Sequence, residues 1–394
     1  MEITFKNLDK DYSKGLREYV GDIQPKFWYH GRRTGLGSVV VKRQSSEHIS
    51  KNRPRSPMFN HVGEYFGYLL AEKAGVKACP VDLVTLHDHK NKYSPTIKLF
   101  TACASHNLKK PGTILMPGEI VLARLGYDGA ADTMISSIGG REGIYRDSIY
   151  VSSSEEDNVD LVIASIVRHT ITSETNAGKR TSEEIQEDVK QNVQDAMDMI
   201  VFDCIFGNHD RHSGNWAMEE DDEIGRTTLY SAYDNEAVLG FRRSVAQISN
   251  VLENEKTMEE ETNNILFSRM TPGKKDRRAN YKDMLDYLVE KYPEYALPSI
   301  LKITSRVDEK YVESLYDAMK GISQRGEDSG ELSNTDELPD AYKYFGMEAF
   351  KARRNYALSL LRTRPNIEVS PSNKIVITSH EGKNKKEDEG LQLA

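Results

Sequence analysis

The chain has 394 residues, of which 38% are hydrophobic and 29% are charged, and its formal net charge is −8. This composition is ordinary for a soluble globular protein and indicates neither a disordered chain nor a membrane protein. The acidic balance also argues against direct binding of nucleic acid, because proteins that bind it usually carry a strong basic excess. The length is sufficient for two lobes or two domains with a substantial core.

The chain contains three cysteines, Cys79, Cys103 and Cys204, and no two of them form a C-x-x-C pair. The sequence therefore predicts neither a disulfide framework nor a structural zinc site. The chain opens on a polar segment without the apolar stretch of a signal peptide, and no apolar run reaches the length of a membrane span. We expect a cytoplasmic protein that does not bind a membrane.

The first hundred residues are typical of strands arranged around one helix. Residues 24–29 form an aromatic-rich run and residues 38–43 form a β-branched run, and both predict strands. Apolar residues recur at helical spacing over residues 62–75, and the run ends on a glycine, as helices often do. Two more strands are predicted over residues 81–86 and 96–100.

The pattern becomes helical after a stretch with little signal, residues 101–160. Thr181 and Glu184 fit a capping box, and an apolar stripe with steps of three and four residues follows them. Further helices are predicted over residues 281–292 and 347–362.

The fold class that these patterns predict is α+β. We expect a sheet-containing unit over residues 1–100, a mainly helical unit over residues 101–370, and a flexible tail over residues 371–394.

One polar segment carries the most informative residues. Residues 207–215 read Gly-Asn-His-Asp-Arg-His-Ser-Gly-Asn, and Asp234 follows at a distance that a short hairpin would span. Phosphoryl transfer by a kinase needs a carboxylate beside the acceptor hydroxyl and oxygen ligands that hold Mg²⁺ against the ATP phosphates. Asp210 is the candidate base, and Asn215 and Asp234 are the candidate metal ligands. The simpler alternative is a polar loop whose side chains cap backbone groups, with Asp234 as an ordinary turn residue.

Other charged residues are candidate contacts to the nucleotide. Lys42 ends the β-branched run, so its ammonium group on a central strand can reach phosphate oxygens. Glu64 on the following helix is its natural ion partner, and Lys26 on the preceding strand is a second candidate for phosphate. His212 is a candidate for contacting phosphate or orienting Asp210. The simpler alternatives are solvated surface charges and a packed loop histidine.

These residues resemble the HipA-like family of serine/threonine protein kinases, which are toxin-type bacterial kinases. Three blocks carry the resemblance, in the order that the family has them. They are Gln-Pro-Lys at residues 24–26, the lysine strand with the next helix at residues 38–42 and 64–75, and the polar segment at residues 207–215 with Tyr233-Asp234.

The resemblance implies a two-lobed protein-kinase-like fold, with the sheet in a small N-lobe and most helices in a larger C-lobe. ATP and Mg²⁺ are the implied cofactors, and a protein serine or threonine is the implied acceptor of the γ-phosphoryl group. The implied roles are catalysis for Asp210, Mg²⁺ binding for Asn215 and Asp234, and phosphate contact for Lys42. Lys98 to Phe100 would form the hinge beside adenine.

Two features depart from the family. Many members carry a regulatory serine in the phosphate loop, but the corresponding residues 17–23 contain none. Inhibitory autophosphorylation at that position is therefore not expected. The chain also has no room for the extra N-terminal subdomain of longer members, so it resembles a short form. A protein substrate is the expected partner, and an antitoxin-like regulator is left open.

Other functions compete with a protein kinase. Residues 210–215 also resemble the catalytic loop of phosphoinositide kinases, although Asp234-Asn-Glu236 does not match the Asp-Phe-Gly that usually follows there. A small-molecule kinase and an ATP-binding pseudokinase scaffold are also open. A binuclear metallophosphoesterase is excluded, because the D-x-H and G-D-x-x-D motifs that would hold two metals are absent upstream.

Overall fold

The structure is a computed structural model. It describes residues 6–8, 12–18, 26–32, 37–43, 46–47, 56–87, 99–124, 157–173, 179–254, 258, 260–261, 270–272, 279–320, 338–362, 367–369 and 375–377.

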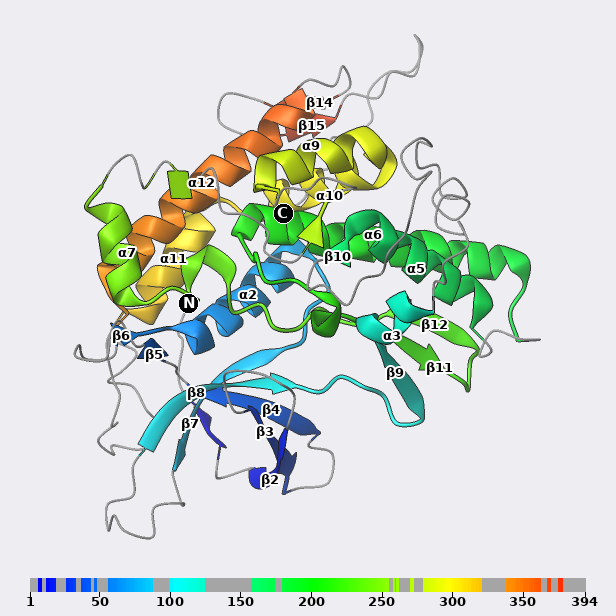
Figure 1. Cartoon of the computed structure of the whole chain (residues 1–394), viewed down its shortest axis with the longest axis horizontal. Helices are drawn as coiled ribbons and strands as arrows, with labels where there is room; N and C mark the ends of the chain where they lie inside the picture. The colour runs from blue at the N-terminus through cyan, green and yellow to red at the C-terminus, as the bar shows by residue number, and fades with distance from the viewer. Residues whose placement is uncertain are drawn as a thin grey trace, which may run out of the picture.

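A six-stranded sheet forms the N-terminal part of the chain (Figure 1). In hydrogen-bonding order its strands are β1 (Lys6–Asn7), β7 (Val81–His87), β8 (Leu99–His106), β4 (Ser38–Arg43), β3 (Lys26–Gly31) and β2 (Tyr12–Glu18). Neighbouring strands are antiparallel except β1, which runs parallel to β7. A separate two-stranded pair consists of β5 (Ser46–Glu47) and β6 (Ser56–Pro57).

Strand β4 presents its two faces to different surroundings, because side chains alternate along a strand. Val39 and Val41 pack with Tyr29 and Val84 in an apolar cluster on one face of the sheet. Lys42 therefore points to the other face, where helix α2 lies. The strand predicted over residues 38–43 is confirmed at both ends.

Helix α2 (Asn60–Ala74) lies between the sheet and the helical part of the chain (Figure 1). Phe66 and Leu70 are fully buried on it. The helix ends at Gly75, which has a left-handed φ of 73° and forms the C-cap. The helix predicted over residues 62–75 is confirmed and begins slightly earlier.

His61 on α2 makes the stability of the fold depend on pH, because burial lowers the pKa of its imidazole to about 3 from an ordinary 6.5. Between these values the unfolded chain binds the proton and the folded chain does not, so stability falls as the pH falls. We expect His61 alone to lower the free energy of unfolding by about 2 kcal/mol between pH 8 and pH 5. Denaturant unfolding should show that stability falls less between pH 8 and pH 5 in His61→Gln than in the wild type. The control His30→Gln, at an exposed histidine, should lose as much stability as the wild type. If His61→Gln kept the full loss, the expectation would be wrong.

The chain leaves the first sheet after β8, through residues 107–112. The backbone N–H of Leu108 donates to the hydroxyl of Tyr230 (2.8 Å) and ties this connection to the following part. The boundary expected at residue 100 falls inside β8, which continues to His106.

A three-stranded antiparallel sheet follows, with the order β12-β11-β9. Its strands are β9 (Thr113–Pro117), β11 (Ala217–Asp221) and β12 (Arg226–Leu229). The alternating pattern of residues 228–233 predicts a strand that ends just before Asp234, but β12 is shorter and starts earlier. Residues 230–234 instead leave the sheet and lead toward α2.

The rest of the described chain is mainly helical (Figure 1). The helices are α3 (Gly118–Ala123), α5 (Val159–Thr172), α6 (Ser182–Phe206), α7 (Val245–Leu252), α9 (Tyr281–Lys291), α10 (Pro293–Arg306), α11 (Glu309–Met319) and α12 (Asp340–Arg362), with the 3₁₀ turns η2 (Ser213–Asn215) and η3 (Val238–Gly240). The helix predicted over residues 281–292 is confirmed, and the one predicted over residues 347–362 begins earlier, at Asp340.

Two short strand pairs complete the described part. They are β10 (Asp157–Asn158) with β13 (Met270–Thr271), and β14 (Ile367–Val369) with β15 (Ile375–Ile377). The second pair includes residues of the expected tail. Residues 378–394 lie outside the described part of the chain.

Helix α6 begins and ends as its sequence predicts. The capping box forms, with the Thr181 N–H donating to Glu184 Oε2 (2.8 Å) and the Glu184 N–H donating to Thr181 Oγ1 (3.2 Å). The helix ends at Gly207, whose φ of 76° is left-handed, and a Cβ there would overlap the guanidinium of Arg353. Glycine at residue 207 therefore sets where the polar segment leaves the helix.

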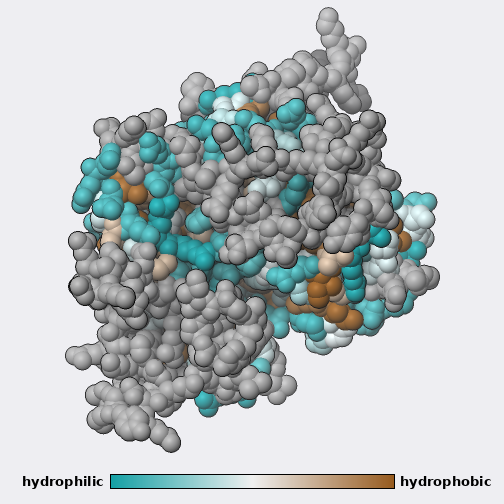
Figure 2. Space-filling model, in the orientation of Figure 1, coloured by the Kyte–Doolittle hydropathy of each residue, from teal (hydrophilic) through white to brown (hydrophobic). Residues whose placement is uncertain are grey.

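A continuous apolar core joins α2 to the helical part. Phe206 of α6 stacks on Phe350 of α12, with ring centroids 5.4 Å apart. On the face shown in Figure 2, a hydrophobic area lies over α3 and β9, where Ile120 and Ile114 are 45% and 48% exposed. None of the helices in the described part of the chain is both long and apolar enough to cross a membrane.

Candidate active site

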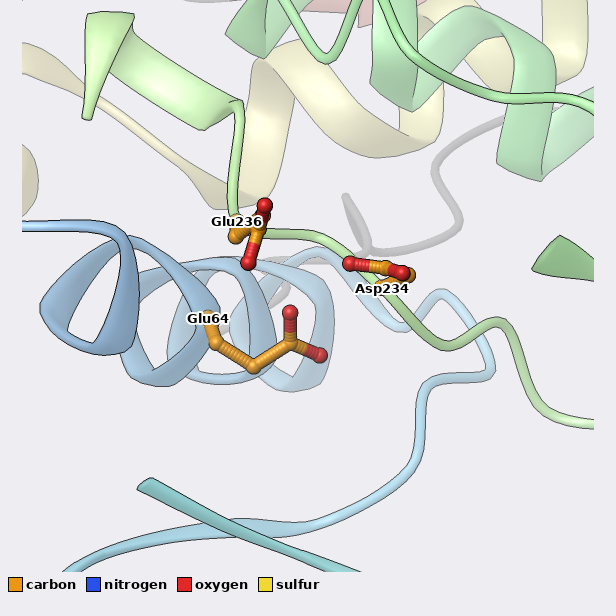
Figure 3. Close-up of side chains that lie close together, drawn as sticks. All are labelled: Glu64, Asp234 and Glu236. Atoms are coloured by element: carbon orange, nitrogen blue, oxygen red, sulfur yellow. The ribbon is translucent and has the colours of Figure 1, made fainter. Parts of the chain in front are cut away.

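Four charged side chains meet between the sheet and the helical part. Lys42 donates to Asp234 Oδ1 (2.5 Å) and to Glu64 Oε2 (3.5 Å), and its Nζ lies 3.7 Å from Glu236 Oε2. Figure 3 shows Glu64 reaching from α2 toward the segment that carries Asp234 and Glu236. One oxygen of each of these three carboxylates lies within 4.8 Å of the others. A buried ammonium group is thus surrounded by three carboxylates.

This cluster carries surplus negative charge. Burial alone would lower the pKa of Lys42, but the charges of Asp234, Glu64 and Glu236 raise it well above its ordinary value. Burial raises the pKa of Glu236 to about 7, with Asp234 and Glu64 adding to the rise and Lys42 opposing it. Lys42 is therefore held in its charged form, and a divalent cation would relieve the repulsion among the carboxylates.

Two glycines let α2 approach the acidic segment. A Cβ at Gly63 would overlap the carbonyl oxygen of Glu236, and a Cβ at Gly67 would overlap the Cβ of Asn235. Gly63 and Gly67 lie one turn apart on the same face of the helix. The backbone that carries Asp234 and Glu236 can therefore lie directly against α2, within reach of Glu64.

We expect Gly67→Ala to lower the free energy of unfolding by about 1–3 kcal/mol, because the added methyl group must displace α2 or the Asn235 backbone. Chemical denaturation measures this change. The control is Gly37→Ala, since a Cβ at Gly37 would lie 3.8 Å from the nearest atom, the Asn107 oxygen, and would not overlap it. Equal stability of the two variants would show that the α2 contact is looser than described.

The backbone at Asp234 has an unusual conformation. Its φ is 61°, in the left-handed region that residues other than glycine rarely adopt. Asp and Asn tolerate this region better than most residues, but the conformation still stores strain of about 1–3 kcal/mol, and such strain is often found at functional sites. The strained backbone directs the Asp234 carboxylate toward Lys42.

Arg211 ties the polar segment to the segment that contains Asp234. It is buried and pairs with Asp203 of α6 through two hydrogen bonds of 2.8 and 3.0 Å. Its Nη1 donates to the carbonyl oxygens of Asn215 (3.1 Å) and Tyr233 (2.6 Å), and its Nη2 donates to Asn235 Oδ1 (2.5 Å). One guanidinium group therefore sets the spacing between the two candidate metal ligands.

Asp210 lies at the open end of this arrangement. Its side chain is 18% exposed and forms an ion pair with Arg242, which follows η3. The amide of Asn215 donates to the Asp210 carbonyl oxygen (3.0 Å), so its Oδ1 is the atom that it can offer to a metal. A carboxylate that is partly open to solvent suits a group that accepts a proton from an incoming hydroxyl.

The histidines of the polar segment have structural contacts. The Nδ1 of His212 accepts a hydrogen bond from the Gly214 N–H (3.0 Å), which closes the turn at η2. Burial lowers the pKa of His209 to about 4, and nearby arginines, Arg242 among them, contribute to this shift. His209 is therefore neutral at physiological pH.

The oxygen-rich donor set fits Mg²⁺. This ion is usually held by one or two carboxylates together with substrate phosphates and water. Asp234 and Glu236 come from one segment, Glu64 faces them from α2, and Asn215 is fixed through Arg211. The predicted ligands Asn215 and Asp234 are thus on adjacent segments, and Glu236 joins them.

Three of the sequence candidates have side chains outside the described part of the chain. Lys26 lies at the start of β3, and Phe100 lies in β8, but their side chains are outside the described part, as is the whole of Lys98. The connection between the two sheets begins after His106, later in the chain than residues 98–100, which are expected beside adenine. Contacts of these residues with a nucleotide remain predictions.

The structure adds residues that were not predicted from the sequence. Glu236 joins the carboxylate cluster, Arg211 and Asp203 hold the polar segment, and Arg242 pairs with Asp210. A signal was present for Asp203, a carboxylate in an otherwise apolar stretch of helix, and for Glu236, which stands two residues after Asp234.

The structure has a two-lobed protein-kinase-like fold of the α+β class. The smaller lobe contains the sheet and the buried Lys–Glu pair, and the larger helical lobe contains the polar loop. Among solved structures, the proinflammatory kinase CtkA of Helicobacter pylori has this fold, with a TM-score of 0.56 and 17% sequence identity. The match covers 91% of this chain and 99% of that chain. The predicted two-lobed protein-kinase-like fold is thereby confirmed.

A second match is HipA from a toxin–antitoxin system of Shewanella oneidensis MR-1, whose structure was solved with HipB and operator DNA. Its TM-score is 0.43 and its sequence identity 12%, over 88% of this chain and 66% of that chain. No protein-family model matches the sequence, and no curated protein matches it.

Proposed function

We propose that this chain is an ATP- and Mg²⁺-dependent kinase that transfers the γ-phosphoryl group to a serine or threonine hydroxyl of a protein. The observation that carries the proposal is the buried Lys42 among Asp234, Glu64 and Glu236, next to the loop with Asp210 and Asn215. A structural scaffold would have no need for such a costly collection of buried charges. The kinase fold supports the same conclusion.

The residues have distinct roles in the proposed reaction. Asp234, Glu236 and Asn215 would hold Mg²⁺, which when bound neutralises charge on the ATP phosphates. Lys42 would contact phosphate oxygens, with Glu64 holding its ammonium group in place. Most of the rate enhancement would come from positioning and charge neutralisation.

Asp210 would act as the base for the acceptor hydroxyl. As the acceptor oxygen bonds to the γ-phosphorus, the bond from that phosphorus to the bridging oxygen breaks and ADP leaves with the electron pair. The proton of the hydroxyl passes to the Asp210 carboxylate. The products are ADP and a phosphorylated side chain.

The test is transfer of label from γ-labelled ATP with Mg²⁺ to proteins of a soluble lysate, comparing the wild type with Asp234→Asn. Labelled phosphoserine or phosphothreonine with the wild type alone would support the proposal. Label in lipids or small molecules would favour a phosphoinositide or small-molecule kinase. Binding of ATP without any transfer would favour a pseudokinase scaffold.

The proposal includes a cytoplasmic location for the protein and a protein partner. The three cysteines are free thiols buried in the fold, which fits a reducing cytoplasmic compartment. The resemblance to toxin-type kinases leaves an antitoxin-like regulator open, which purification of the chain with its bound partners would test.

A further inference from the structure

Arg242 connects two carboxylates of the candidate active site. Its Nη1 pairs with Asp210 Oδ2, and its Nε lies 3.8 Å from Glu236 Oε1. It follows the η3 turn, and its side chain is 35% exposed. Arg242 thus spans the distance from the proposed base to the proposed metal site.

The carboxylates of the site carry more negative charge than its cations balance. In the described part of the chain, its four carboxylates are Glu64, Asp210, Asp234 and Glu236, and its two cations are Lys42 and Arg242. When all are ionised, the negative charges exceed the positive charges by two. Arg211 does not change this difference, because it is paired with Asp203. The deficit equals the charge of one divalent cation.

Each cation of the site is held by a carboxylate that has a role in the reaction. Lys42 is held by Asp234, and Arg242 is held by Asp210. A divalent ion held by Asp234 and Glu236 competes with Lys42 for Asp234 and with Arg242 for Glu236. It would therefore release cationic groups at the place where the ATP phosphates arrive.

Arg242 has the chemistry that a transferring phosphoryl group needs. A guanidinium group is always charged and binds phosphate oxygens with its planar fork, and an arginine supplied within the same chain can stabilise the transition state. The guanidinium group of the loop itself, that of Arg211, is already bound to Asp203 and to the carbonyl oxygens of Asn215 and Tyr233.

We propose that Arg242 is a catalytic residue that holds Asp210 in the metal-free protein and binds an oxygen of the transferring phosphoryl group when Mg²⁺ and ATP are bound. This inference rests on the proposed kinase function. It adds a second cation to the site, beside Asp210, to the one that Lys42 supplies.

The test compares Arg242→Gln, Arg242→Lys and the control Arg243→Gln. Arg243 is adjacent in sequence, but it pairs with Glu261 and lies over the ring of Phe345. Two quantities are measured: the affinity for Mn²⁺ or Mg²⁺ without ATP, by calorimetry, and the single-turnover rate of transfer with Mg²⁺ and ATP.

We expect Arg242→Gln to bind the divalent ion about tenfold more tightly, because a competing charge is gone, and to transfer about 10²- to 10³-fold more slowly. Arg242→Lys keeps the charge and should be intermediate in rate, with wild-type ion affinity. Arg243→Gln should match the wild type in both quantities.

Other results overturn the inference. Faster transfer by Arg242→Gln would make Arg242 an inhibitory contact, and unchanged ion affinity with unchanged transfer would make it a surface ion pair. In both cases the wild type is active, so the proposed function stands. A wild type that neither binds Mg²⁺ with ATP nor transfers phosphate would overturn the proposed function and this inference with it.

Discussion

Asp210→Asn should lower the rate of phosphoryl transfer by about 10²- to 10⁴-fold while leaving the fold and the binding of Mg²⁺ and ATP intact. The reason is that an amide cannot accept the proton of the acceptor hydroxyl, and a positioned base contributes a factor of this size. Asp210 is outside the cluster around Lys42, so its loss leaves the proposed metal ligands in place. Single-turnover transfer measures the rate, and calorimetry measures nucleotide binding.

Asp234→Asn is the contrasting variant. It removes a carboxylate that contacts Lys42 and is proposed to hold Mg²⁺, so both Mg²⁺-dependent ATP binding and transfer should be lost. Asparagine also tolerates the left-handed backbone at this residue, so the fold should persist. Near-normal turnover by either variant would show that the roles are assigned to the wrong residues.

Arg211→Met should lower the free energy of unfolding by about 3–5 kcal/mol, because it leaves Asp203 buried without its charged partner. Both side chains of this pair are at most 2% exposed. The variant also loses the hydrogen bonds to the Asn215 and Tyr233 carbonyls. Denaturant unfolding measures the stability, and transfer should fall as well because the two segments lose their fixed spacing.

A double variant separates the buried charge from the packing. Asp203→Leu combined with Arg211→Met removes both charges and should recover part of the lost stability, as replacing a whole buried pair often costs little. The control Lys190→Met affects an exposed pair with Glu187 and should not change stability measurably. A loss for Arg211→Met no larger than for Lys190→Met would contradict the organising role of Arg211.

The local features of this fold could be predicted from sequence. The capping box at Thr181 and the β-branched strand that carries Lys42 depend on a few neighbouring residues, and both agree with the structure. The residues of the polar segment were also recognisable, because Asp210 and Asn215 stand close together in the chain.

The partners of these residues could not be predicted. Arg242 pairs with Asp210 although 32 residues separate them, and Lys42 meets Asp234 because α2 packs closely on Asn235 and Glu236. Such contacts are set by packing between segments far apart in sequence, which periodicity does not reveal. Nothing in the sequence pattern distinguished Arg242 from Arg243, its neighbour with a different contact.

The continuation of β8 beyond residue 100 was not predicted, for a related reason. The residues from Thr101 to His106 are mostly small or polar and lack the β-branched pattern that indicates a strand. They nevertheless form a strand because β4 and β7 provide hydrogen-bonding partners on both sides. Tertiary pairing here outweighs a weak intrinsic preference.

The close packing of α2 bears on how the activity could be switched on and off. Protein kinases are commonly regulated through the position of the corresponding helix, which makes or breaks the Lys–Glu pair. Here the Gly67 face of α2 abuts Asn235, Tyr311 donates to the Leu69 carbonyl (3.3 Å), and Arg306 donates to the Ala74 carbonyl (3.4 Å). An outward swing of α2 would have to break all of these contacts together. We therefore expect control to act on access of nucleotide or acceptor, with the Lys42–Glu64 pair assembled at rest.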